Sequence, residues 1–194
     1  MQNLLLKNIA SKGVVLTDDE AGIVLSSFSS KKFRRRQYIL QSGDVATHDN
    51  FILSGLARMY KIDEKGHEQI LKFTPEDWWT GDLGSFLTGN PSQYNVDCIE
   101  DTEVLRITYE DLDALCDKVP KMNKYFRLLY QKSIEGYAAR LNSTLNKSAL
   151  ERYEEFFRRF PHIHQRVPDY QIASYLGITP QSLSRLRNQS ATKN

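Results

Sequence analysis

The chain has 194 residues, of which 40% are hydrophobic, 26% are charged and 11% are aromatic. This length allows one or two compact domains, and the composition excludes disordered, collagen-like and coiled-coil proteins. Purely aliphatic or aromatic runs such as 51–53 are far shorter than the roughly 20 residues that a membrane-spanning helix needs. Lys7 and Asn8 interrupt the apolar start, so no secretory signal is expected. We expect a soluble, cytoplasmic protein with no membrane partner.

The formal net charge of +2 conceals an uneven distribution. Residues 1–145 carry 18 Lys and Arg against 20 Asp and Glu, whereas residues 146–194 carry eight against four. The C-terminal quarter is therefore basic, which favours a polyanionic partner for that part. The two cysteines, Cys98 and Cys116, are too few for a disulfide framework, a zinc site or an iron–sulfur cluster. We expect ordinary thiols and no bound metal.

The segment 33–107 has the pattern of a β-rich domain. Short runs rich in Tyr, Ile, Leu, Phe and Val alternate with turn clusters at intervals of about ten residues, which is typical of an antiparallel sandwich or roll. Leu56–Ile62 and His67–Phe73 predict a β-hairpin, in which Gly66 supplies the positive φ that such a turn commonly needs.

Helix starts flank this segment. Two capping boxes occur, Thr17-Asp18-Asp19-Glu20 and Ser148-Ala149-Leu150-Glu151. In each box, the side chains of the first and last residues accept hydrogen bonds from each other's free backbone amides. They predict a short helix to about Ser27 and a second helix from Ala149 to about Phe160, which Pro161 ends. Thr108 is a further cap candidate.

A long helix is predicted from Pro120 to about residue 146. Apolar residues recur at steps of three and four along one face, and a second stripe runs beside it. The first stripe is Phe126, Tyr130, Ile134, Tyr137, Leu141 and Leu145, and the second is Met122, Phe126, Leu129, Ser133 and Gly136. A helix about 39 Å long that is apolar on more than one side must pack against its own domain and a further surface. A twin helix from a second subunit is the simplest partner, and burial within the monomer is the alternative.

Residues 169–188 carry the strongest signal, a helix-turn-helix. Ala173 is small enough to let the second helix approach, and Gly177 allows the left-handed conformation of the tight turn. Thr179 caps the second helix, and Pro180 occupies its first turn, where no amide hydrogen is required. The core positions are Ile172, Leu176, Ile178, Leu183 and Leu186.

The second helix also presents polar residues with the chemistry of base recognition. An arginine can bind guanine O6 and N7, and a glutamine can bind adenine N6 and N7. The candidate DNA-binding residues are Thr179, Gln181, Ser182, Ser184, Arg185, Arg187 and Asn188. The alternative is a helical hairpin that only packs and leaves these residues in solvent.

From end to end, the chain resembles the Crp/Fnr family of bacterial transcription regulators. Gly-Asp-Leu-Gly-Ser-Phe-Leu at 81–87 resembles the family's phosphate-binding cassette, and 166–185 resembles a subgroup of its DNA-binding domains. The resemblance implies an α+β fold with an N-terminal antiparallel β-roll, the jelly roll of cyclic-nucleotide-binding proteins, a long dimerisation helix and a C-terminal all-α helix-turn-helix domain. We expect the sensor roll in 1–119, the dimerisation helix and hinge in 120–146, and the DNA-binding domain in 147–194.

The cassette departs from that of cyclic-nucleotide-binding members. In those, Gly-Glu-Leu is followed about ten residues later by Arg-Ser, whereas Ser92 and Gln93 occupy these positions here. A buried anionic phosphate would lack a compensating cation, so we do not expect cyclic AMP to bind. No cofactor is assigned, and an unknown small-molecule effector stays open. Its candidate pocket residues are Trp79, Gly81, Asp82, Leu83, Ser92 and Gln93.

The DNA-binding part departs as well. Pro180 and Gln181 replace the Arg-Glu that often begins the family's recognition helix, so we expect a different operator. No residues are expected for the wing that many members place after this helix. Contacts to backbone phosphates are therefore expected from Arg166, Arg187 and Lys193.

These observations predict a homodimeric, sequence-specific DNA-binding transcription regulator with a pseudo-palindromic operator and RNA polymerase as a further partner. No phosphate-binding loop, nucleophile elbow or His-Glu-x-x-His motif occurs, so an enzyme is not expected. The rival hypothesis is a ligand-binding sensor whose C-terminal domain contacts a protein.

Overall fold

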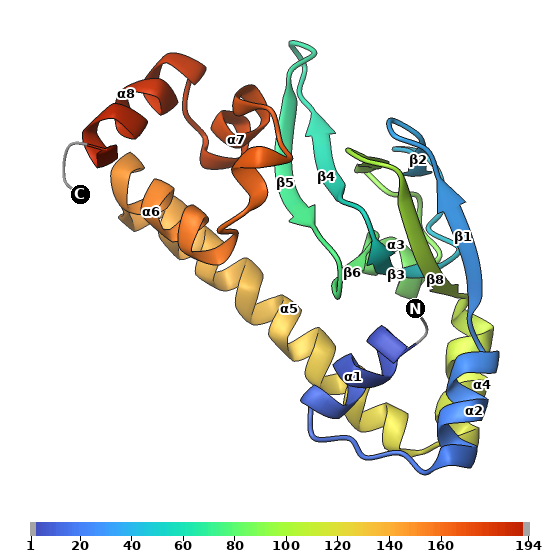
Figure 1. Cartoon of the computed structure of the whole chain (residues 1–194). Coiled ribbons are helices and arrows are strands. Elements are labelled where there is room, and N and C mark those ends of the chain that lie inside the picture. Colours follow the sequence, from blue (N-terminus) through green and yellow to red (C-terminus); the bar gives the residue numbers. More distant parts are fainter. Residues whose placement is uncertain (1–2, 192–194) are drawn as a thin grey trace.

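The computed structural model describes residues 3–191 and shows a β-rich N-terminal part and a helical C-terminal part joined by one long helix (Figure 1). That helix is α5, Lys121–Asn146. It runs diagonally along the molecule, from α1 and α4 at one end to the C-terminal helices at the other (Figure 1). The two parts also contact each other beside it, where β5 meets α7.

Within residues 3–191, eight strands form two antiparallel four-stranded sheets with the orders β1-β8-β3-β6 and β2-β7-β4-β5. The strands are β1 Ser29–Phe33, β2 Tyr38–Leu40, β3 Asp49–Ser54, β4 Ala57–Ile62, β5 Glu68–Thr74, β6 Trp79–Thr80, β7 Asn95–Cys98 and β8 Thr102–Ile107. β4 and β5 form the predicted hairpin, and Gly66 in its turn has a φ of 81°. The predicted β-roll is confirmed.

Four helices accompany the sheets: α1 Asn3–Ser11, α2 Asp18–Ser26, α3 Leu83–Thr88 and α4 Tyr109–Lys118. The capping box of α2 forms as predicted, with the Thr17 amide donating to Glu20 Oε2 at 2.7 Å and the Glu20 amide donating to Thr17 Oγ1 at 3.2 Å. The sequence reasoning did not identify α1, whose Leu5 and Ile9 are fully buried. It also did not identify α3.

The N-terminal half of α5 belongs to the core of the roll. Trp79 packs against Phe51, Tyr125 and Phe126 with ring centroids 5.5–6.4 Å apart. The Trp79 indole donates to the Tyr125 hydroxyl at 2.9 Å, and that hydroxyl donates to Asn8 at 2.8 Å. Both cysteines are buried free thiols, and burial raises the pKa of Cys98 to about 11, in agreement with the expected ordinary thiols.

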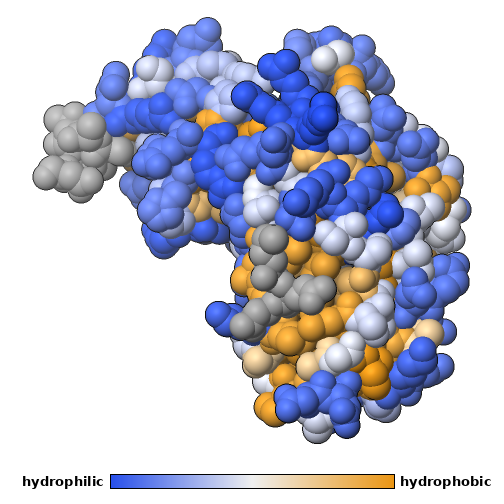
Figure 2. All heavy atoms as spheres, turned by 45° about the vertical axis from the view of Figure 1, so that its right-hand side comes forward, coloured by the Kyte–Doolittle hydropathy of each residue, from blue (hydrophilic) through white to orange (hydrophobic). Residues whose placement is uncertain are grey.

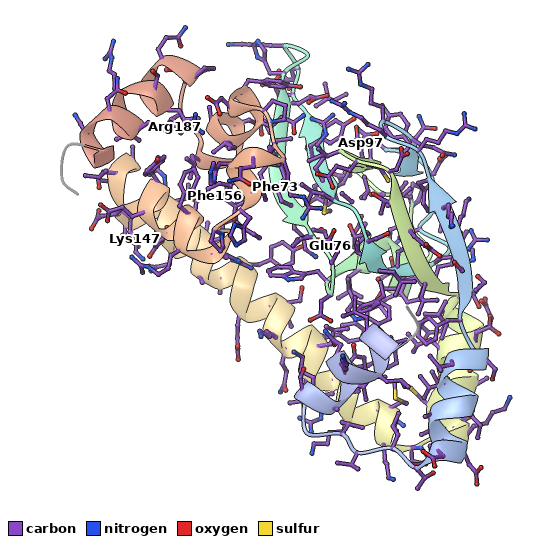
Figure 3. The ribbon with its side chains drawn as sticks, viewed as in Figure 1. Phe73, Glu76, Asp97, Lys147, Phe156 and Arg187 are labelled. Atoms are coloured by element: carbon purple, nitrogen blue, oxygen red, sulfur yellow. The ribbon has the colours of Figure 1, made fainter. Side chains whose placement is uncertain are left out.

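The C-terminal part consists of α6 Ala149–Arg159, a 3-10 turn at Ile163–Gln165, α7 Asp169–Leu176 and α8 Pro180–Ala191. The second capping box forms at Ser148 and Glu151 and starts α6. Phe156 of α6 meets Phe73 of β5, with ring centroids 6.1 Å apart (Figure 3). A second apolar cluster is therefore shared between the β4–β5 hairpin and the C-terminal helices. No helix in residues 3–191 is long and apolar enough to cross a membrane.

Candidate nucleic-acid interface and cavity

The helix-turn-helix forms as predicted from the residues of its turn. α7 ends at Gly177, whose φ of 65° is left-handed, and the Ile178 amide donates back to the Ala173 carbonyl at 3.0 Å. Thr179 caps α8 by accepting the Ser182 amide at 3.2 Å. The inward positions Ile172, Ala173, Leu176 and Leu183 are all buried. The turn and these buried side chains together set the angle between the two helices.

Four of the predicted DNA-binding residues lie together on one exposed face of α8. They are Gln181, Ser184, Arg185 and Asn188, and all four are exposed. Their spacing of i, i+3, i+4 and i+7 places them on a single side of a helix. A donor-rich helical face of this width fits the major groove of duplex DNA.

Thr179, Ser182 and Arg187 form hydrogen bonds beside this face. Thr179 is the cap of α8, and the hydroxyl groups of Thr179 and Ser182 lie 3.0 Å apart. Arg187 donates to Asp169 at 2.7 Å and so joins α8 to the start of α7 (Figure 3). These residues lie beside the exposed face and hold its helix in place.

The structure separates the residues predicted to contact backbone phosphates. Arg166 points to the roll, where its guanidinium donates to Glu76 and Glu100 at 2.7–2.9 Å. Arg166 therefore joins the C-terminal part of the chain to the roll, because both of its carboxylate partners belong to the roll. Arg187 is next to the exposed face but already paired with Asp169. Lys193 lies outside the described residues.

Two further side chains tie the C-terminal helices to β5, an edge strand of its sheet. Ser174 Oγ donates to the Glu68 carbonyl at 2.6 Å and accepts the Ile70 amide at 3.0 Å. Arg140 of α5 donates to the Ile70 and Tyr175 carbonyls at 3.0 Å and stacks over the Tyr175 ring. α7 thus satisfies backbone groups that the free edge of a sheet would leave to solvent.

The cassette at 81–93 is closed by its own hydrogen bonds. Asp82 caps α3 by accepting the amides of Gly84 at 3.0 Å and Ser85 at 3.3 Å. Ser92 donates to the other oxygen of the same carboxylate at 2.8 Å. Gln93 accepts from Lys61 at 3.2 Å. The polar atoms predicted to bind an effector are thus occupied by one another and by neighbouring residues.

Comparisons with known proteins agree with this architecture. Residues 30–119 match the cyclic nucleotide-binding domain family. The fumarate and nitrate reduction regulatory protein of Vibrio cholerae serotype O1 is 30% identical over 169 residues, which cover 80% of this chain and 66% of that protein. This chain belongs to the Crp/Fnr family.

Solved structures of Crp/Fnr type show the same fold. FixK2 from Bradyrhizobium japonicum matches with a TM-score of 0.76 at 18% identity, over 86% of this chain and 85% of that one. The catabolite activator protein of Thermus thermophilus matches with a TM-score of 0.56 at 21% identity, over 92% and 85%. The predicted α+β fold class is confirmed. The match to the curated relative spans just under two thirds of that relative's length.

This Crp/Fnr chain has a cavity of about 520 Å³ beside the cassette, where β5, β6 and α5 meet the C-terminal helices. Trp79, Gly81 and Leu83 line it, whereas Asp82, Ser92 and Gln93 do not. The sequence reasoning missed Lys72, Arg140, Arg159 and Tyr175, which also line the cavity. No local signal marks them, because they come from different elements that meet only through tertiary packing. In residues 3–191, no group of three or more His, Cys, Asp or Glu side chains could hold a metal ion.

Proposed function

We propose that this chain is a sequence-specific DNA-binding transcription regulator that acts as a homodimer. The exposed face of α8 carries the proposal, because Gln181, Ser184, Arg185 and Asn188 gather on one side of a capped helix. Its similarity to a regulatory protein and to a catabolite activator protein supports the same class of function.

Base recognition would rest on two of these side chains. Arg185 can donate two hydrogen bonds to guanine, and Gln181 can pair with adenine. The surrounding surface is compatible with this, since the region of the C-terminal helices is predominantly hydrophilic in Figure 2. Ser182 and Arg187 would support this face from its edge.

The C-terminal half of α5 is the proposed dimer surface. Ile134, Leu141 and Leu145 are 66%, 62% and 72% exposed, so a long apolar stripe faces solvent in the single chain. A second copy related by a two-fold axis would bury both stripes against each other. The same axis would place two α8 helices about 34 Å apart and favour a pseudo-palindromic operator.

Control of this dimer would come from movement between its parts. We propose a sensor roll in 1–119, a dimerisation helix and hinge in 120–146 and a DNA-binding domain in 147–194, with RNA polymerase as a partner of the bound dimer. An effector would favour one arrangement of the roll and the DNA-binding domain over another. Cyclic AMP does not suit this role, because Asp82 and Ser92 already bind each other where its phosphate would need a cation.

Salt dependence distinguishes this proposal from a protein partner. Binding of the full chain to a labelled DNA duplex should weaken steeply between about 50 and 200 mM salt, because phosphate neutralisation releases counterions. Arg185→Ala should cost about 1–3 kcal/mol on a preferred sequence and relax that preference. Arg158→Ala is the matched control, since Arg158 is exposed on α6 and lies outside α8. An affinity that is insensitive to salt and to Arg185→Ala would instead support a protein partner.

A further inference from the structure

The cavity of about 520 Å³ has aromatic walls drawn from three parts of the chain. Trp78 and Trp79, the chain's two tryptophans, line it from the roll, Tyr130 lines it from α5, and Phe160 and Tyr175 line it from the C-terminal part. Flat rings on several sides favour a flat ligand, because stacked and edge-on ring contacts add to the burial of apolar area.

Two polar groups without partners are buried beside the cavity. Thr80 is 1% exposed, and its hydroxyl has no hydrogen-bond partner among the described residues. The hydroxyl of Tyr130 is also buried and unpaired there. A buried polar group without a partner costs about 1–3 kcal/mol. Neither hydroxyl oxygen is exposed to the cavity, so both lie behind its wall.

An acidic and a basic residue that influence each other's pKa, Asp49 and Lys72, also line the cavity. Asp49 is buried, and burial raises the pKa of its carboxyl to about 7 although the Lys72 ammonium opposes this. Burial lowers the pKa of Lys72 to about 8, and Asp49 opposes this shift. Lys72 donates to the Trp79 carbonyl at 2.8 Å. Within residues 3–191, Asp49 and Lys72 form no ion pair with each other.

The outer part of the cavity carries cations without carboxylate partners. Arg140 is held by backbone carbonyls, and Arg159 lies over the rings of Trp78 and Phe160 at 5.3 and 5.4 Å. Neither forms an ion pair within residues 3–191. The remaining charged side chains on the wall are Lys12, Lys132, Asp77 and Glu135. Cations thus outnumber carboxylates on the wall. Burial lowers the pKa of Arg140, and the charge of Arg159 is near enough to lower that pKa further.

Gly136 keeps the cavity open on the side of α5. Glycine inside a helix costs up to about 1 kcal/mol relative to alanine. A Cβ atom at Gly136 would meet no neighbouring atom closer than the Arg159 guanidinium at 3.9 Å. Close helix packing therefore does not require this glycine, whereas a larger side chain would project toward Arg159 and the cavity.

We propose that this cavity binds a small planar aromatic anion, whose acidic group faces Arg140 and Arg159 and whose ring lies among the aromatic walls. Such a ligand would touch the roll, α5 and the C-terminal helices at once and would fix their relative positions. The binding site follows from the cavity alone, and only its regulatory effect rests on the proposed function.

The test uses a fluorescent aromatic anion, 1-anilinonaphthalene-8-sulfonate, titrated into the full chain. Because both tryptophans line the cavity, binding there should quench tryptophan emission by energy transfer and saturate at one probe per chain. N-phenyl-1-naphthylamine has the same rings without the sulfonate. We expect it to bind at least about tenfold more weakly, which corresponds to 1.4 kcal/mol.

Two pairs of variants locate the probe. Gly136→Leu should abolish quenching by filling the cavity, whereas Gly136→Ala should retain it. Arg159→Met should weaken sulfonate binding at least about tenfold and leave the uncharged probe unaffected, whereas Arg158→Met should change neither. Equal affinity for the two probes, binding without tryptophan quenching, or unchanged binding in Gly136→Leu and Arg159→Met would overturn the proposal. DNA binding of the same samples is measured separately without probe. A chain that binds the probe but not DNA would contradict the proposed function and leave the proposed ligand site standing.

Discussion

The two halves of α5 carry similar apolar patterns but meet different surroundings. Met122, Tyr125 and Phe126 in the first half are buried in the core of the roll. Ile134, Leu141 and Leu145 in the second half face solvent. Hydrophobic periodicity therefore identifies a face that must be covered, but it does not identify what covers it. In the first half the cover is the chain itself, and in the second half we propose a second copy.

The largest expected effect is in the buried half. Phe126→Ala should lower the free energy of unfolding by about 3–5 kcal/mol, because it leaves a cavity among packed aromatic rings. Leu145→Ala is the matched control and should change the stability of the single chain by less than about 0.5 kcal/mol. Urea denaturation at a protein concentration that keeps the chain monomeric gives both values. Equal losses in the two variants would show that the halves do not differ in this way.

The exposed half should determine association instead. Leu141→Glu places a carboxylate on each side of the two-fold contact, and we expect a dissociation constant about 30- to 100-fold higher, equivalent to about 2–3 kcal/mol. Sedimentation equilibrium measures this directly. Ile62→Glu is the control, because Ile62 is also an exposed apolar residue but lies on the β4–β5 hairpin. If Leu141→Glu associates as tightly as the unmodified chain, the dimer surface lies elsewhere.

The second half of α5 also has a side that faces its own chain, through Arg140. Arg140→Ala removes charged hydrogen bonds to carbonyls of β5 and α7, each worth about 1.5–3 kcal/mol. Amide hydrogen exchange in α7 should speed up by about tenfold or more. Arg127→Ala is the control, since Arg127 is exposed and contacts only its helix neighbour Gln131 in the described part of the chain. Unchanged exchange would show that Arg140 does not hold α7 to the roll.

The smallest expected effect is at Gly136, between the two halves. Gly136→Ala should raise the free energy of unfolding by up to about 1 kcal/mol, because alanine loses less backbone entropy in a helix. The space around its Cβ atom allows this, with Arg159 at 3.9 Å. The same urea titration used for Phe126→Ala provides the measurement. A destabilised Gly136→Ala variant would contradict the open cavity at this position.

Local chemistry explains which elements were predictable from the sequence. The predicted helix caps and glycine turns all form, because each depends on residues within a few positions of one another. The caps are at Thr17, Ser148 and Thr179, and the turns are at Gly66 and Gly177. The order of roll, long helix and helix-turn-helix followed from these elements and the change of hydrophobic period.

Tertiary packing explains what was missed. α1 has a short apolar run without a capping signal, and burial against the roll rather than local preference stabilises it. The side of the cavity nearest the cassette was anticipated through Trp79, Gly81 and Leu83. Its other walls include residues of α5 and the C-terminal helices that lie more than 40 residues away. The docking of Arg166 on Glu76 and Glu100 likewise joins groups 90 and 66 residues apart in the chain. No spacing rule connects such residues.

The central claim is that two copies of this chain place two α8 helices on one DNA duplex. Selection of binding sites from a random duplex library by the purified full chain tests this most directly. We expect enrichment of an inverted repeat whose half-site centres lie about 10 base pairs apart. Enrichment of a single half-site, or of no sequence with or without cell extract, would contradict it.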